Sequence, residues 1–201
     1  DLRARVDGYV ATYAPAVKSF GPLELDAMLV TATGPSYAHG VDADVALAER
    51  LSAAAGCTVD LVSLSIVSAL RALEVSSIRL LSPYPPWLTE RSVAYWEGAG
   101  LRVASVVPVS EAFRSYDLQT AEVLSALDRA RALDGEAVLL TGTGMTSVNA
   151  IRTAAPDYDV PIVSSNVCGA WRLLKLTRAT PSAAFKAVAP ALAERLAGDR
   201  R

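Results

Sequence analysis

The 201-residue sequence has few of the residues on which several common protein functions depend. Two cysteines and a single histidine, His39, are too few for a disulfide framework or a structural zinc site, and reduced thiols fit a cytoplasmic protein. Nineteen basic residues against 21 acidic ones leave no basic surface of the kind that binds nucleic acid. Uncharged apolar runs such as residues 61–70 are too short to cross a bilayer. We therefore expect a cytoplasmic protein that holds no metal and has neither nucleic acid nor a membrane as a partner.

Two phosphate-binding motifs are also missing from the sequence. It contains no Gly-x-Gly-x-x-Gly and no Gly-Lys followed by Ser or Thr, which disfavours enzymes that handle phosphates. The chain opens at Asp1 and has no charged segment followed by an apolar one, so its start does not resemble a signal peptide. We expect that the natural N-terminus lies further upstream.

Hydrophobic residues make up 52% of the chain and charged residues 20%, which is enough apolar material for a core. Short apolar runs that end in Gly, Ser or Pro alternate with stretches rich in Ala and Leu, the pattern of an α/β protein. We expect strands at residues 27–33, 58–62, 78–81, 102–108, 137–141 and 161–164. Helices are expected at residues 2–17, 41–55, 66–73, 89–99, 116–133, 147–154, 167–176 and 181–196.

Two segments repeat one pattern at the end of an apolar strand. Residues 28–36 read MLVTATGPS, and residues 138–146 read VLLTGTGMT. In parallel α/β sheets, ligands lie at the carboxyl ends of strands, and a turn rich in Gly and Thr lets backbone N–H groups approach an anion. The repeat therefore predicts an anion site shared by two pseudo-symmetric lobes. The alternative is that both turns only join strand to helix, with Ser or Thr as a cap.

Four stretches, taken in order, resemble the Asp/Glu racemase superfamily in its arylmalonate decarboxylase and maleate isomerase branch. These stretches are residues 32–40 (ATGPSYAHG), 69–84 (ALRALEVSSIRLLSPY), 139–144 (LLTGTG) and 160–171 (VPIVSSNVCGAW). No single motif is specific, but their order and spacing together are. The resemblance extends from about residue 25 to residue 176.

The resemblance implies an α/β fold of two pseudo-symmetric lobes, each a mostly parallel sheet flanked by helices. Residues 1–70 and 167–201 would form the first lobe and residues 71–166 the second, with the active site in the cleft between them. It also implies an N-terminal strand unit that nothing in this sequence matches.

Relatives of this kind act on small dicarboxylates or malonates without a cofactor or metal. The resemblance therefore implies a small carboxylic or dicarboxylic acid as ligand and no cofactor. The resemblance assigns catalytic roles to Thr33 and Tyr84. It assigns substrate-binding roles to Gly34, Ser36, His39, Thr143 and Gly144. Hydroxyls and backbone N–H groups of this set would hold a carboxylate and stabilise the charge that develops on it.

The sequence departs from the family at both thiol positions. Racemases and isomerases of the family carry one thiol on each lobe, and the decarboxylases carry one on the second lobe. Ala32 stands at the first position and Gly142 at the second. Cys57 and Cys168 do not replace these thiols, and we expect both to be packing residues, although Cys168 follows a strand end at a helix start, where a thiol pKa falls.

The first hypothesis is therefore a cofactor-independent lyase that resembles arylmalonate decarboxylase. It would act on a small malonate-like or dicarboxylic acid through an enediolate held by the oxyanion site, with Tyr84, His39 or water in place of the thiol as proton donor. The alternatives are an isomerase or racemase-like enzyme with altered chemistry, and a non-catalytic protein that binds a carboxylate. Whether Ala32 and Gly142 are natural or engineered, and whether the chain forms a homo-oligomer, stays open.

Overall fold

The computed structural model describes residues 1–110, 113–114 and 116–198. Within them the strands are β1 (Ala27–Val30), β2 (Thr58–Leu61), β3 (Ser77–Ser82), β4 (Arg102–Pro108), β5 (Ala137–Leu140) and β6 (Ile162–Ser164). The helices are α1 (Leu2–Gly8), α2 (Val10–Lys18), α3 (Ser36–His39), α4 (Val41–Ala55), α5 (Val62–Ala72), α6 (Pro86–Gly98), α7 (Thr120–Ala130), α8 (Val148–Ala154), α9 (Ser165–Leu176), α10 (Ala183–Val188) and α11 (Pro190–Gly198). A short 3₁₀ helix, Ala155–Asp157, follows α8.

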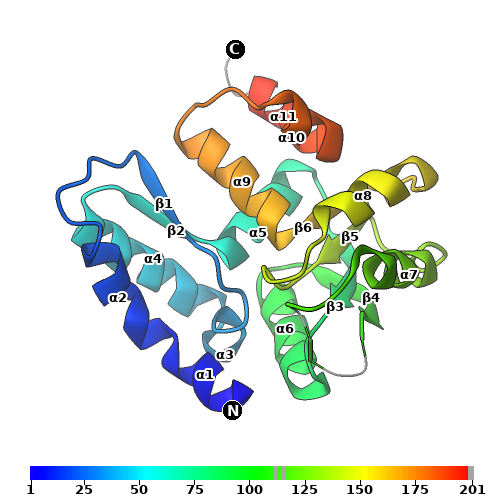
Figure 1. Cartoon of the computed structure of the whole chain (residues 1–201), viewed down its shortest axis with the longest axis horizontal. Coiled ribbons are helices and arrows are strands. Elements are labelled where there is room, and N and C mark those ends of the chain that lie inside the picture. Colours follow the sequence, from blue (N-terminus) through cyan, green and yellow to red (C-terminus); the bar gives the residue numbers. More distant parts are fainter. Residues whose placement is uncertain (111–112, 115, 199–201) are drawn as a thin grey trace.

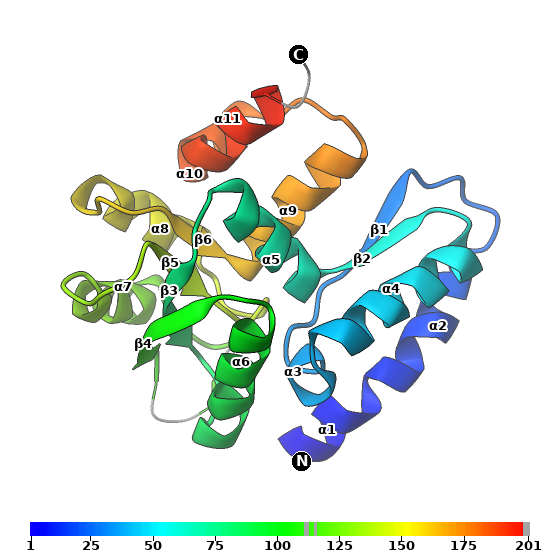
Figure 2. The same ribbon diagram turned by 180° about the vertical axis from the view of Figure 1, so that it is seen from behind.

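The strands form two separate parallel sheets, which confirms the predicted α/β class. One sheet has the order β1-β2 and the other the order β4-β3-β5-β6. Helices α2 and α4 lie beside the smaller sheet, whereas α6, α7 and α8 surround the larger one (Figures 1 and 2). Helices α5 and α9 pack against each other between the two sheets (Figures 1 and 2). The division at residues 70 and 167 stays a prediction, and residues 199–201 of its first lobe lie outside the described residues.

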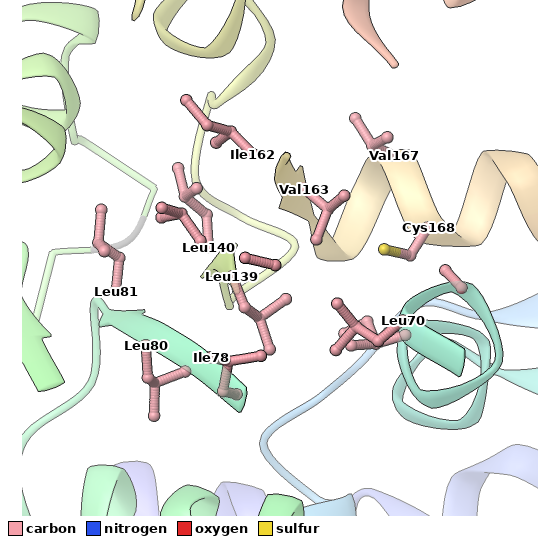
Figure 3. Close-up of a cluster of buried hydrophobic side chains, with 14 of the residues drawn as sticks. Leu70, Ile78, Leu80, Leu81, Leu139, Leu140, Ile162, Val163, Val167 and Cys168 are labelled. Carbon is pink, nitrogen blue, oxygen red and sulfur yellow. The ribbon is translucent and has the colours of Figure 1, made fainter. Parts of the chain in front are cut away.

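The larger core is built on the central strands β3 and β5. Its side chains include Leu80 and Leu139, both fully buried, and Leu70 from α5 extends it toward the smaller sheet. Figure 3 shows Cys168 of α9 beside Leu70 in this cluster. The thiol of Cys168 is fully buried, and burial raises its pKa. Cys168 is therefore a packing residue, because a buried thiol in apolar surroundings is inert.

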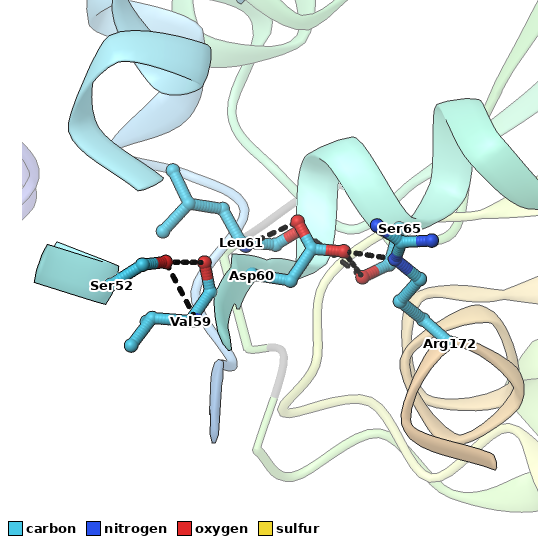
Figure 4. A network of polar contacts seen from close by, with 6 residues as sticks. All are labelled: Ser52, Val59, Asp60, Leu61, Ser65 and Arg172. Carbon is cyan, nitrogen blue, oxygen red and sulfur yellow. Dashed lines mark hydrogen bonds and ion pairs between the residues drawn. The ribbon is translucent and has the colours of Figure 1, made fainter. Parts of the chain in front are cut away.

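A nearly buried ion pair ties α9 to the smaller sheet (Figure 4). One carboxylate oxygen of Asp60 in β2 accepts a hydrogen bond from Nε of Arg172 at 2.6 Å and another from the hydroxyl of Ser65 at 3.2 Å. The other oxygen accepts the N–H of Leu61 at 2.9 Å. With both of its oxygens occupied by donors, this carboxylate fixes α5 and α9 relative to β2.

Several predicted helix boundaries were wrong: the segment 2–17 forms two helices, and α6 begins at Pro86 rather than residue 89. Three other differences have a local reason. Helix α5 begins at Val62 rather than residue 66, because it is buried on nearly every side and lacks the polar face that marks a helix start. Helix α7 begins at Thr120 rather than residue 116, because Gln119 and Glu122 form a capping box there. The C-terminal helix is divided at Pro190, whose ring has no N–H to donate.

Helix α3 was not predicted at all, since four residues are too short to show periodicity. No helix within the described residues is both long enough and apolar enough to cross a membrane.

Candidate functional site

The two repeated turns line one cavity of about 390 Å³. The first turn follows β1 and the second follows β5, so both lie at the carboxyl ends of parallel strands. Tyr84, just after β3, lines the same cavity, and helices α1 and α2 cover it. The lining side chains are Leu2, Arg5, Val6, Tyr9, Thr12, Tyr13, Ala16, Val30, Thr31, Ala32, Thr33, Gly34, Pro35, Tyr84, Leu88, Phe113, Tyr116, Gly142, Thr143 and Gly144.

The first turn contributes a side-chain hydroxyl to the cavity. Thr33 is 1% exposed, and its Oγ1 lies 2.6 Å from the phenol oxygen of Tyr84. Burial raises the pKa of Tyr84 to about 12, although the hydrogen bond with Thr33 lowers it. The phenol is therefore protonated at neutral pH. Two hydroxyls that share one hydrogen bond keep a second O–H proton, which can be donated to a ligand.

The second turn contributes its backbone. The hydroxyl of Thr143 donates to the carbonyl of Thr31 at 2.7 Å, so it is used to join the two turns. The side-chain amide of Asn166 donates to the carbonyl of Thr143 at 3.1 Å and fixes the turn from the other side. Among the described residues, the N–H groups of Gly34, Thr143 and Gly144 have no hydrogen-bond acceptor. Free N–H groups that line one cavity with two hydroxyls are the donors that an anion site requires, so this is the candidate anion site.

Gly142 leaves no room for a side chain at the second thiol position. Its φ of +87° is one that residues with a Cβ rarely adopt. A Cβ on this residue would stand 2.7 Å from Cγ of Pro83 and 3.5 Å from the phenol oxygen of Tyr84. A cysteine therefore does not fit here without a shift of the Pro83 loop.

No cysteine is found among the described residues that line the cavity. Ala32, at the first thiol position, does line it and is half-buried. Cys57 is half-buried at the start of β2, and Cys168 lies in the larger core. In the described part of the chain, no three side chains of His, Cys, Asp and Glu are grouped so that they could hold a metal ion.

Two of the predicted binding residues, Ser36 and His39, do not line the cavity. Both lie on α3, where Ser36 is buried and His39 is exposed. Ser36 faces Asp44, a buried carboxyl group that also accepts a hydrogen bond from the phenol of Tyr95 at 2.8 Å. Burial raises the pKa of Asp44, and the hydrogen bonds from Ser36 and Tyr95 oppose that rise. Helix α3 thus turns both residues toward a second polar cluster.

Aromatic and basic residues that the sequence analysis did not select complete the cavity. The ring of Phe113 stacks on Tyr84, with centroids 6.1 Å apart and planes 16° apart. Behind Tyr84, and not part of the cavity lining, the ring of Tyr37 meets Tyr84 edge-on at 5.9 Å. Arg5 and Val6 reach the cavity from α1. The apolar residues Val6 and Tyr13 lie at helical spacing, a pattern that marks a buried helix face but does not show what that face covers.

A wider depression of about 900 Å³ lies beside α11. Its rim includes Glu74 and Arg195, whose side chains pair with each other at 3.3 Å. Neither repeated turn lines it, so it is not the candidate site.

Two parallel sheets, with two repeated turns around one cavity at the carboxyl ends of their strands, define an α/β protein with a candidate anion site. A sequence profile of the arylmalonate decarboxylase family matches residues 5–187, so the chain belongs to the arylmalonate decarboxylase family.

Particular relatives agree with this assignment. The chain is similar to the maleate isomerase of Nocardia farcinica (strain IFM 10152), with 30% identity over 175 residues that cover 83% of this chain and 65% of the relative. It is also similar to the arylmalonate decarboxylase of Bordetella bronchiseptica, with 27% identity over 155 residues that cover 72% of this chain and 62% of the relative. The matches thus span just under two thirds of the length of these relatives.

The fold is that of solved members. A Nocardia farcinica maleate cis-trans isomerase, a cysteine-to-serine mutant with a covalently bound succinylcysteine intermediate, superimposes with a TM-score of 0.84. The identity is 20%, over 94% of this chain and 80% of that one.

Proposed function

We propose that this protein is a cofactor-independent lyase that decarboxylates a small malonate-like or dicarboxylic acid without a thiol. The observation that carries the proposal is the Thr33–Tyr84 hydroxyl pair, 2.6 Å apart, in one cavity with the free N–H groups of Gly34, Thr143 and Gly144. Donors aimed at an oxygen whose charge grows during a reaction stabilise the transition state more than the ground state.

In the proposed reaction, one carboxylate of the acid accepts hydrogen bonds from Tyr84 and from the N–H groups of Thr143 and Gly144. The second carboxylate lies toward the apolar part of the lining, which includes Val6 and Leu88. Apolar surroundings destabilise this charged group and favour its loss as carbon dioxide.

The bond between the α-carbon and the departing carboxylate breaks, and its electron pair passes into the retained carboxylate as an enediolate. The α-carbon then takes up a proton in place of the lost carboxylate. We assign the proton to the phenol of Tyr84, with replacement from solvent, or to a water molecule in the cavity. His39 is not used, because it lies on α3 outside the cavity.

A second candidate function is binding without turnover. The observation that favours it is the packing of Pro83 against Gly142, which leaves the second thiol position without space for any side chain. The same observation argues against covalent cis–trans isomerisation, because the solved relative holds its intermediate on a cysteine and this cavity has none.

A proton NMR time course in D₂O distinguishes these functions. The protein is incubated with phenylmalonate, methyl-phenylmalonate and maleate in separate samples, with a Tyr84→Phe variant as control. We expect deuterated phenylacetate from phenylmalonate, formed much more slowly by the variant. Broadened phenylmalonate signals without product would indicate a binding protein. If no acid gave product and the NMR signals of all three stayed unbroadened, the assignment of this cavity as a carboxylate site would be wrong.

A further inference from the structure

Arg5 is the only charged side chain among the described residues that line the cavity. It lies in α1, and its side chain is exposed. It has no ion pair with any described residue, whereas its neighbours on the helix are engaged. Arg3 lies over the ring of Trp87 at 4.4 Å, and Asp7 pairs with Arg91 at 3.9 Å. A cation without a partner in an otherwise uncharged cavity attracts an anionic group of the ligand.

The position of Arg5 shows which part of a ligand it can reach. A shallow outer space, lined by Asp1, Leu2, Ala4, Arg5 and Phe113, adjoins the cavity. Arg5 and Phe113 line both spaces, so they stand where the cavity opens outward. The carboxylate of Asp1 lines only the outer space, and one of its oxygens is used as the cap of α1, at 2.8 Å from the N–H of Ala4.

Three places therefore accept three parts of an acid. The Thr33–Tyr84 pair and the N–H groups hold the retained carboxylate, and the apolar wall receives the departing one. The remaining substituent points to the opening, where the ring of Phe113 and the guanidinium of Arg5 meet it. If Arg5 lay beside the departing carboxylate, its guanidinium would stabilise the ground state and slow the loss of carbon dioxide. This is a further reason to place the anion of the substituent, rather than the departing carboxylate, beside Arg5.

We infer that Arg5 selects acids whose substituent ends in an anionic group, such as a malonate with a carboxylate-bearing aryl side chain. This inference rests on the proposed function, since it requires the oxyanion site to hold the first carboxylate. It makes Arg5 a specificity-determining residue rather than a catalytic one.

The test compares two monoacids that are not decarboxylated, phenylacetate and 4-carboxyphenylacetate, by titration calorimetry at low salt. The wild-type protein should bind 4-carboxyphenylacetate roughly five- to tenfold more tightly. Arg5→Gln should remove this preference and weaken phenylacetate binding no more than Arg3→Gln does, and Arg5→Lys should keep most of the preference. Arg3→Gln removes the same charge from the same helix without touching the cavity, so it should retain the preference.

Two results would overturn the inference. In the first, Arg5→Gln still binds 4-carboxyphenylacetate more tightly than phenylacetate. In the second, Arg5→Gln and Arg3→Gln lose this preference to the same extent, which would indicate only a general effect of charge. Either result leaves phenylacetate binding intact, and with it the oxyanion site on which the proposed function depends. If the wild-type protein bound neither acid, the oxyanion site would fail and the inference with it.

Discussion

The turns after β1 and β5 have similar sequences but differ in the space that they leave for a side chain. In the first turn, a Cβ on Gly34 would make ordinary contacts with Val6 and Leu88, at 3.7 and 3.8 Å. In the second turn, Gly142 has a φ of +87°, and its Cβ would stand 2.7 Å from Pro83. The first turn can therefore accept larger side chains, and the second cannot.

The two turns also contribute different chemistry. The hydroxyl of Thr33 in the first turn contacts Tyr84 in the cavity. The matching hydroxyl of Thr143 is used on the carbonyl of Thr31, so the second turn offers its N–H groups instead. A repeated sequence has thus become a site with side-chain donors on one side and backbone donors on the other.

Gly142→Ala should produce the largest change of stability. The substitution adds a strained backbone conformation and a contact with Pro83, which together should lower the free energy of unfolding by roughly 2–4 kcal/mol. Urea unfolding monitored by circular dichroism measures the change. Gly34→Ala is the control in the first turn, where an added Cβ makes only ordinary contacts, and we expect it to change stability by less than about 1 kcal/mol. Equal losses in the two variants would contradict the difference between the turns.

Thr33→Val should reduce activity far more than Thr143→Val. Removal of a hydroxyl from an oxyanion site costs about a hundredfold in kcat, and Thr33 also orients Tyr84. Thr143→Val loses only the hydrogen bond to Thr31, for which we expect roughly a tenfold loss. Initial rates of phenylmalonate decarboxylation measure the loss in each variant. If the protein binds acids without turnover, phenylacetate affinity should also fall more in Thr33→Val than in Thr143→Val. The reverse order would show that the second hydroxyl also serves the ligand.

Ala32→Cys should place a reactive thiol in the cavity, because this position already lines it and carries a Cβ. In a Cys57→Ser background, the only other thiol is that of Cys168, which is buried with a raised pKa. Iodoacetamide should therefore modify residue 32 at least about tenfold faster than Cys168, as followed by mass spectrometry. Phenylacetate should protect it. Equal modification rates for residue 32 and Cys168 would place residue 32 away from the cavity.

The smallest expected effect is on stability at high pH. Tyr84 has a pKa near 12 in the folded protein, above its ordinary value of 10, so the unfolded chain loses this proton first as the pH rises. The stabilisation from the protonated phenol is complete below pH 10 and disappears as the pH rises through 12. Thermal unfolding at intervals from pH 9 to 12 should show a smaller decline for Tyr84→Phe than for the wild type. An identical decline would mean that Tyr84 is not buried against Thr33.

Much of the fold could be predicted from local pattern. The bounds of α4 and β4 agree with the prediction, because α4 has regular apolar spacing and ends at Gly56, whose φ is +72°. The boundaries that differ depend on features that periodicity does not report. Helix α5 has no polar face, and the start of α7 depends on the hydrogen bonds between Gln119 and Glu122.

The candidate site could be predicted only in part. The turns and Tyr84 come from strand ends of parallel sheets, so their meeting follows from the repeat and the topology. The direction of Ser36 and the placement of Arg5 over the cavity do not, because each depends on how a helix packs. The closure of Gly142 by Pro83 joins residues from different strand ends, and no local pattern predicts that contact.

The most direct test of the account is a crystal structure of the protein with phenylacetate. We predict one carboxylate oxygen within about 3 Å of the Thr33–Tyr84 hydroxyls and the other at a similar distance from the N–H groups of Thr143 and Gly144. The ring should lie toward Phe113. Phenylacetate in the depression beside Arg195, or a cavity empty at saturating concentration, would contradict the assignment of the two turns as a carboxylate site.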